Sequence, residues 1–201
     1  MTQPVLYMIA GPNGAGKTTA ALKLLPQFLK VDEFVNADAI AYGLNPLNAE
    51  EQAVAAGRLM LKRMDNLIQM KKSFAFETTG SSHCFINKLK KARTVGYKLG
   101  LVYLWIGHVD FAKFRVKIRV AQGGHDIPQD VIERRYKRGL HNVLSYYLPL
   151  VDRASFFDTT LPSAYLELIT EKREDMMQIH RPDTWAMMQR IAEETAADAT
   201  G

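Results

Sequence analysis

Near its amino terminus the chain carries the pattern G-x-x-x-x-G-K-T, spelled out as Gly11-Pro12-Asn13-Gly14-Ala15-Gly16-Lys17-Thr18. Glycines let a backbone wrap around a phosphate with several N–H groups pointing inward, and a following helix adds the positive end of its dipole. Lys17 can reach the outer phosphates of a nucleoside triphosphate, and the Thr18 hydroxyl can hold Mg²⁺. The apolar run before the loop and the helix-favouring run after it predict a strand–loop–helix unit. We therefore predict that residues 11–18 and Thr19 bind a nucleotide.

The bulk composition is that of an ordinary globular protein. The 201 residues are 47% hydrophobic and 23% charged, which is enough for one α/β domain with a substantial core. Cys84 is the only cysteine in the sequence, so no internal disulfide can form and a reducing cytoplasm is the expected setting. The chain shows no secretory signal pattern, and no apolar run reaches the ~18 residues of a membrane span.

The excess positive charge is concentrated in one segment. The formal net charge is +5, and residues 113–138 hold eight basic against three acidic side chains, an excess equal to that of the whole chain. Such a cluster can bind nucleic acid, form a solvated helix face or clamp an anionic ligand. A phosphate loop in the same small domain favours the clamp, and we consider nucleic acid the weaker interpretation.

Strand-like and helix-like segments alternate along the chain. The strands are expected at residues 5–10, up to Asp38, and at 73–78, 97–106, 154–158 and 165–169. This alternation predicts a mostly parallel sheet with helices on both faces. Ligands of such sheets bind beyond the carboxyl ends of the strands. The phosphate loop, Asp38, residues 77–80 and residues 107–110 should therefore converge.

The basic segment is ambiguous in its first half. Residues 114–120 alternate strictly, as a strand would, but a helix would place Phe111, Phe114, Ile118 and Ala121 on one stripe. We favour the helix. A second helix should start at or just after Pro128 and run to about Tyr147, and Gly123 and Gly124 would let the segment between the two helices move as a lid.

Several motifs together resemble a family. They are the phosphate loop, Asn36-Ala37-Asp38, Phe76-Glu77-Thr78-Thr79-Gly80, the segment from Arg115 to Pro128 with its Gly-Gly-His, and Ile132 to Arg138 with its spaced arginines. The set resembles zeta-toxin-like P-loop kinases, and among them the small stand-alone bacterial proteins often described as ABC-type ATPases. The resemblance covers about residues 5–142. It implies a three-layer P-loop kinase fold, with residues 1–201 forming a single kinase domain and a lid around residues 110–142.

The resemblance also implies an activity and a set of residues. The activity is Mg²⁺-dependent transfer of the γ-phosphate of ATP or GTP to a hydroxyl group of a small molecule, which in zeta toxins is a UDP-linked N-acetyl amino sugar. Asp38 matches the general base, and Arg119 and Arg135 match the lid arginines that stabilise the transferring group. Lys17 matches the phosphate contact. Glu77, Thr78 and Thr79 match the strand end that binds substrate. Besides these, we assign Asp38 to substrate binding, and also Arg138, because helical spacing places it on the same face of the second helix as Arg135.

The metal shell departs from the usual pattern. No apolar run ends in the aspartate of a Walker B motif, unless Phe157-Asp158 serves. In kinases of this architecture the strand beside the loop strand often supplies the acid, so we assign Thr18 and Glu77 to the metal.

Other interpretations remain open. Asp38 could cap a helix, Glu77 could be a structural acid, and the arginines could be solvated. The whole chain could instead be a kinase for a nucleoside, an antibiotic or an RNA end. It could also be a slow NTPase or nucleotide-dependent module that binds a partner of the antitoxin kind.

Overall fold

The fold is built on a seven-stranded sheet with the strand order β2-β3-β1-β4-β5-β6-β7. The computed structural model describes residues 3–24, 31–124, 126–161 and 166–198. The strands are β1 (Val5–Ala10), β2 (Glu33–Val35), β3 (Phe74–Thr78), β4 (Lys98–Trp105), β5 (Arg153–Asp158), β6 (Glu167–Arg173) and β7 (Met176–Ile179). The first five pair in parallel, and β6 and β7 extend the sheet antiparallel. The prediction of an α/β fold with a mostly parallel sheet is confirmed.

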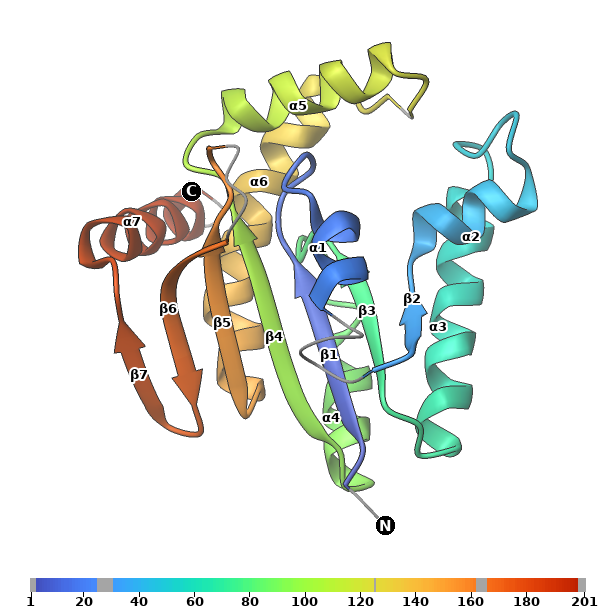
Figure 1. The fold of residues 1–201 in the computed structure, drawn as a ribbon, viewed down its shortest axis with the longest axis horizontal. Helices are drawn as coiled ribbons and strands as arrows, with labels where there is room; N and C mark the ends of the chain where they lie inside the picture. The colour runs from blue at the N-terminus through green and yellow to red at the C-terminus, as the bar shows by residue number, and fades with distance from the viewer. Residues whose placement is uncertain (1–2, 25–30, 125, 162–165, 199–201) are drawn as a thin grey trace.

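Helices cover both faces of this sheet and one of its ends. They are α1 (Lys17–Leu24), α2 (Ala37–Leu44), α3 (Ala53–Gln69), α4 (Ile86–Thr94), α5 (Val109–Ala121), α6 (Gln129–Asn142), the short π and 3₁₀ turns η2 (Val143–Tyr147) and η3 (Leu148–Leu150), and α7 (Pro182–Asp198). In Figure 1, α1 lies in front of the sheet, α4 and α6 lie behind it, and α5 crosses above the carboxyl ends of the strands. This arrangement is the predicted three-layer fold.

The central strands explain where the phosphate loop stands. β1 lies between β3 and β4, and Leu6, Met8, Ile9 and Ala10 are fully buried. Continuous apolar runs are typical of parallel strands covered on both faces, because neither side of the strand meets water. The loop therefore leaves the sheet from its buried centre, between two neighbouring strands.

Two elements were missed by the sequence interpretation. Helix α2 begins directly after Asn36, whose side-chain oxygen accepts a hydrogen bond from the Ala39 N–H at 3.1 Å and caps the helix. Asp38 is therefore not the cap but lies in the first turn of α2. Strand β7 was also not predicted, because its four residues are exposed and the turn before it uses Glu174 with φ 55° rather than a glycine. Of the predicted strand at 165–169, residue 165 lies outside the described residues, and β6 begins at Glu167.

Helix α5 confirms the helical interpretation, and its apolar stripe lies on the surface. Its buried residues are Ala112 and Val116, whereas Phe111, Phe114 and Ile118 are 46%, 61% and 42% exposed. The face that packs inward is the one that meets the phosphate loop. The most apolar face of the helix is left on the surface.

Helix α6 is locked to the connection that follows β3. The backbone of Gly139 approaches Thr79 so closely that a Cβ at position 139 would lie 2.5 Å from the Thr79 carbonyl oxygen. Asn142, only 2% exposed, donates to the Gly80 carbonyl oxygen at 3.2 Å and bonds the His83 ring at 2.9 Å. These contacts fix α6 relative to the carboxyl end of β3. No helix in the described ranges is both long and apolar enough to cross a membrane.

Candidate functional site

The predicted phosphate loop has the backbone form that the sequence pattern requires. Gly11, Gly14 and Gly16 have φ values of 150°, 79° and 77°, in the region that only glycine adopts easily. A Cβ at Gly11 would also lie 2.4 Å from the Leu104 carbonyl oxygen on β4. Lys17 lies in the first turn of α1, is 8% exposed, and donates to the Pro12 carbonyl oxygen at 3.0 Å. The lysine is thus folded back over its own loop.

Glu77, at the carboxyl end of β3, makes polar contacts with three residues at or beside this loop. Its Oε2 accepts hydrogen bonds from the Thr18 hydroxyl and from the Asn36 amide, both at 2.7 Å. Its Oε1 lies 3.9 Å from the Lys17 ammonium, and its side chain is 12% exposed. The adjacency of β1 and β3 brings these groups together, as the convergence of strand ends predicted.

This donor set suits a magnesium ion held mainly by its nucleotide. Mg²⁺ prefers oxygen ligands and is commonly held by one or two protein groups, with phosphate oxygens and water completing its shell. Thr18 and Glu77 offer a hydroxyl and a carboxylate oxygen 2.7 Å apart. Within the described ranges no group of three or more His, Cys, Asp and Glu side chains could hold a metal by protein ligands alone. The residues present therefore fit magnesium that arrives with a nucleotide.

The pKa of Lys17 responds to charged side chains from several elements. Burial lowers the pKa of the Lys17 ammonium from its ordinary value of 10.5, and Glu77 and Asp38 act against this shift. The guanidinium groups of Arg119 and Arg135 lower the same pKa further. Four side chains from α2, β3, α5 and α6 thus act electrostatically on one ammonium group.

The other predicted substrate-binding residues are less uniformly placed. Thr78 accepts a hydrogen bond from the Gly80 N–H at 3.1 Å, and the Thr79 and Ser81 hydroxyl groups are 2.8 Å apart, so both threonines shape the turn after β3. Arg138 is exposed on α6, and the structure shows no ion pair for it within the described residues. Of the nucleotide-loop residues, Thr19 is exposed on α1. His125 of the Gly-Gly-His segment lies outside the described residues.

Asp158, the alternative metal acid, is engaged elsewhere. It ends β5, two strands away from β1, and its Oδ2 accepts a hydrogen bond from Arg181 at 2.9 Å. Its Oδ1 accepts from the backbone N–H of Thr160 at 2.9 Å and from the Thr160 hydroxyl. Glu77, not Asp158, is the carboxylate beside Thr18.

Residues 1–146 match the family model described as Zeta toxin. The chain belongs to the zeta toxin family. A relative from Haemophilus influenzae, described as an uncharacterized protein, is 33% identical over 126 residues, which are 63% of this chain and 88% of that protein. Membership of the zeta toxin family supports nucleotide binding and a kinase-like function.

Solved structures agree on the fold. The structure of the PezAT chromosomal toxin–antitoxin system of Streptococcus pneumoniae superimposes with a TM-score of 0.66 at 12% identity, covering 98% of this chain and 88% of that one. AvrRxo1-ORF1:-ORF2 with ATP gives a TM-score of 0.72 at 16% identity, covering 92% and 63% of the two chains. A protein of Chloroflexus aurantiacus, provisionally titled a kinase, gives 0.63 at 18% identity and covers 98% of each chain. At these identities the likeness concerns the fold alone.

Two residues at the site were missed by the sequence interpretation. Asn36 both caps α2 and donates to Glu77, and an asparagine directly before a helix was the signal that could have identified it. Arg115 was not among the predicted site residues, yet it donates to the Gly14 carbonyl oxygen in the phosphate loop. No sequence signal separates Arg115 from its neighbours on α5, because the difference lies in which face meets the loop.

Proposed function

We propose that the protein is a Mg²⁺-dependent phosphotransferase that moves the γ-phosphate of ATP, or of GTP, to a hydroxyl group of a small molecule. The observation that carries the proposal is the cluster beside the phosphate loop, in which Glu77 accepts from the Thr18 hydroxyl at 2.7 Å and lies 3.9 Å from the Lys17 ammonium. Asp38, Arg119 and Arg135 also act on the charge of Lys17. Phosphoryl transfer needs positioning and charge neutralisation more than covalent chemistry. A buried cation on which two carboxylates and two guanidinium groups act would fit both needs.

Each residue has a role in this proposal. The backbone N–H groups of the phosphate loop and Lys17 would bind the β- and γ-phosphates, and Thr18 and Glu77 would hold Mg²⁺. The metal would neutralise phosphate charge. Asp38, exposed in the first turn of α2, would take the proton of the acceptor hydroxyl. Arg119 and Arg135 would stabilise the charge on the transferring group, and Thr78, Thr79 and Arg138 would line the acceptor side.

The lid of this single-domain kinase would be the outer half of the α5–α6 unit. Gly123 has φ 84°, and the Gly124 N–H donates to the Arg119 carbonyl oxygen at 2.9 Å, so a tight turn follows the arginine. The first half of α5 packs on the phosphate loop, where a Cβ at Gly14 would lie 2.9 Å from the Ala112 carbonyl oxygen. Closure would therefore move the Arg119 end of α5 more than its amino-terminal end.

The proposed acceptor class follows from the family. Zeta toxins act on a UDP-linked N-acetyl amino sugar, and this class is the first to test. Nucleic acid is disfavoured because Lys113 pairs with Glu133 at 3.1 Å and Arg115 bonds to backbone carbonyl groups, so two members of the basic segment face the protein. A reducing cytoplasm is the compartment we propose, since Cys84 is a free, exposed thiol.

A screen with γ-labelled ATP tests the proposal. The full chain, Mg²⁺ and a panel of UDP-amino sugars, nucleosides, aminoglycosides and RNA ends should give one labelled product that depends on Asp38. Asp38→Asn should lose that product, whereas Asp183→Asn, the same change in the first turn of α7, should keep it. An Asp38→Asn protein that turned over its acceptor at the native rate would remove Asp38 from the mechanism.

A nucleotide-dependent partner-binding module is the second candidate. It is favoured by the exposed stripe of Phe111, Phe114 and Ile118 on α5, beside the phosphate loop. The titles of two similar structures name a toxin–antitoxin system and a two-chain complex, so a protein partner of the antitoxin kind fits this candidate. ATP binding without any labelled product across the acceptor panel would favour it over the kinase.

A further inference from the structure

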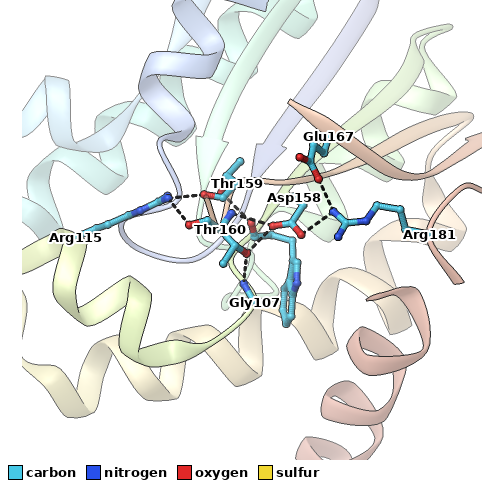
Figure 2. A network of polar contacts seen from close by, with 8 residues as sticks. Gly107, Arg115, Asp158, Thr159, Thr160, Glu167 and Arg181 are labelled. Carbon is cyan, nitrogen blue, oxygen red and sulfur yellow. Dashed lines mark hydrogen bonds and ion pairs between the residues drawn. The ribbon is translucent and has the colours of Figure 1, made fainter. Parts of the chain in front are cut away.

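The guanidinium of Arg115, on α5, bonds both to the phosphate loop and to the segment after β5. Its Nη1 donates to the Gly14 carbonyl oxygen at 3.4 Å, and its Nη2 donates to the carbonyl oxygens of Thr159 and Thr160, the second at 2.9 Å. Figure 2 shows this side chain reaching from α5 toward the segment after β5. One side chain thus joins the apex of the phosphate loop to the carboxyl end of a strand on the other side of β4.

The Gly14 carbonyl is a group whose direction matters for anion binding. A phosphate loop binds through N–H groups that point inward, so a carbonyl oxygen pointing the same way would repel the phosphate. Gly14 has φ 79°, and a Cβ there would lie 3.1 Å from Arg115 Cβ, so the helix and the loop are already in contact. A cationic donor that holds the Gly14 oxygen, as Arg115 does, would keep that oxygen away from a bound phosphate and leave the N–H groups for the ligand.

The segment after β5, which accepts the hydrogen bonds of Arg115, is itself held by several hydrogen bonds. The Thr159 backbone and hydroxyl group both donate to the Trp105 carbonyl oxygen at 2.8 Å, and the Thr160 hydroxyl accepts from the Gly107 N–H at 2.7 Å. Thr160 is also bound to Asp158, which Arg181 pairs at 2.9 Å (Figure 2). The Thr159 and Thr160 carbonyl groups that accept hydrogen bonds from Arg115 are therefore held in place by other contacts and form a fixed anchor for it.

Arg115 differs in this respect from the proposed catalytic arginines. The guanidinium groups that lower the pKa of Lys17 are those of Arg119 and Arg135. Arg115 instead directs its Nη atoms at three backbone carbonyl oxygens. Arg115 therefore contacts the backbone of the phosphate loop and is not one of the proposed reacting groups.

We propose that Arg115 is a positioning residue that holds the phosphate loop in its anion-binding form by anchoring the Gly14 carbonyl to the segment after β5. The inference rests on the proposed nucleotide binding and adds a residue that controls its affinity. Hydrogen bonds to a charged group contribute more than neutral ones, and their loss here should weaken nucleotide binding by about tenfold to a hundredfold. Arg115 should affect the nucleotide KM and leave kcat at saturating nucleotide nearly unchanged.

Calorimetric titration of the full chain with ADP tests this inference. Arg115→Ala should bind ADP about tenfold or more weakly, and Arg115→Lys should recover part of the loss because it keeps a cationic donor. Lys117→Ala removes the same charge from an exposed position on the same helix and should bind ADP as the native protein does. If Arg115→Ala does not fold, Arg115→Gln takes its place with the same expectation.

The outcomes separate the inference from the proposed function. A purely structural arginine would lower the melting temperature and the folded fraction but leave the ADP affinity of the folded protein unchanged, and that result would overturn the inference. Equal weakening in Lys117→Ala would also overturn it, because net charge would then be the cause. If the native chain bound no ADP, the proposed function would fail and the inference with it. Native binding with an unaffected Arg115→Ala or Arg115→Gln would refute only the inference.

Discussion

Replacing Glu77 with glutamine should impair the site with little change in shape. In the native protein Oε2 accepts two hydrogen bonds at 2.7 Å, and Oε1 lies 3.9 Å from the Lys17 ammonium. A glutamine oxygen can still accept from Thr18 and Asn36, but its NH₂ group then faces Lys17, donor against donor. The substitution thus isolates the charge of Glu77 from its size.

The size of the effect follows from these contacts. Each hydrogen bond to a charged acceptor exceeds a neutral one by ~1 kcal/mol, so two such bonds amount to about 2 kcal/mol. The Coulomb energy of the Lys17–Glu77 pair at 3.9 Å is about 4 kcal/mol at an effective dielectric constant of 20, and desolvation cancels part of it. A net loss of about 2 kcal/mol corresponds to roughly thirtyfold. The same carboxylate charge would hold Mg²⁺ when a nucleotide binds, so we take these contacts as the scale and expect Glu77→Gln to weaken Mg²⁺-dependent ATP binding by about this factor.

Titration with ATP in the presence and absence of Mg²⁺ measures the effect. The native protein should gain affinity with Mg²⁺, and Glu77→Gln should lose most of that gain. Glu33→Gln is the control, because Glu33 pairs with Arg63 at 2.7 Å on the surface and its loss should cost at most ~1 kcal/mol of stability and no affinity. If Glu77→Gln kept the native response to Mg²⁺ within threefold, Glu77 would have no part in holding the metal.

Three further changes test other parts of the site. Asp38→Asn should slow transfer to the acceptor by roughly 10²–10⁴-fold, as expected for loss of a general base, and leave ATP affinity unchanged in the same calorimetric titration. ADP affinity should fall as pH rises, and the fall should begin below pH 10.5, the ordinary pKa of a lysine side chain. Burial lowers the pKa of Lys17, and only its protonated form attracts phosphate, so a pH series showing no loss until above 10.5 would contradict this reasoning. Asn142→Ala should destabilise the protein by about 2 kcal/mol, because it leaves the Gly80 carbonyl and the His83 ring without their buried partner. A melting temperature within a degree of the native value would argue against that role.

The sheet was predictable because its strands are continuous apolar runs. β1 and β4 lie within the predicted ranges, and the convergence of strand ends brought Glu77 beside Thr18 as expected. These features depend on local composition and on a general rule of parallel sheets. Helix α2 was missed because the preceding strand was predicted to run to Asp38, whereas β2 ends at Val35 and α2 begins at Ala37.

Helix α5 shows what periodicity cannot supply. The alternation of residues 114–120 suited a strand, and the stripe through Phe114 suited the helix that we favoured. The structure has the helix, with that stripe exposed. Periodicity identifies which residues share a face, while tertiary contacts decide which face is covered. The roles of Arg115 and Asn36 were hidden for the same reason, since each depends on a partner more than 40 positions away, at Gly14 and Glu77.

The position of β1 in the sheet also has a consequence for the nascent chain. β1 pairs with residues 74–78 on one side and 98–103 on the other, so both neighbours leave the ribosome long after it. An apolar strand of this kind remains open to misassociation until the chain beyond residue 103 has emerged. Chaperone occupancy on the growing polypeptide should therefore be highest before that point and fall once both partners are available.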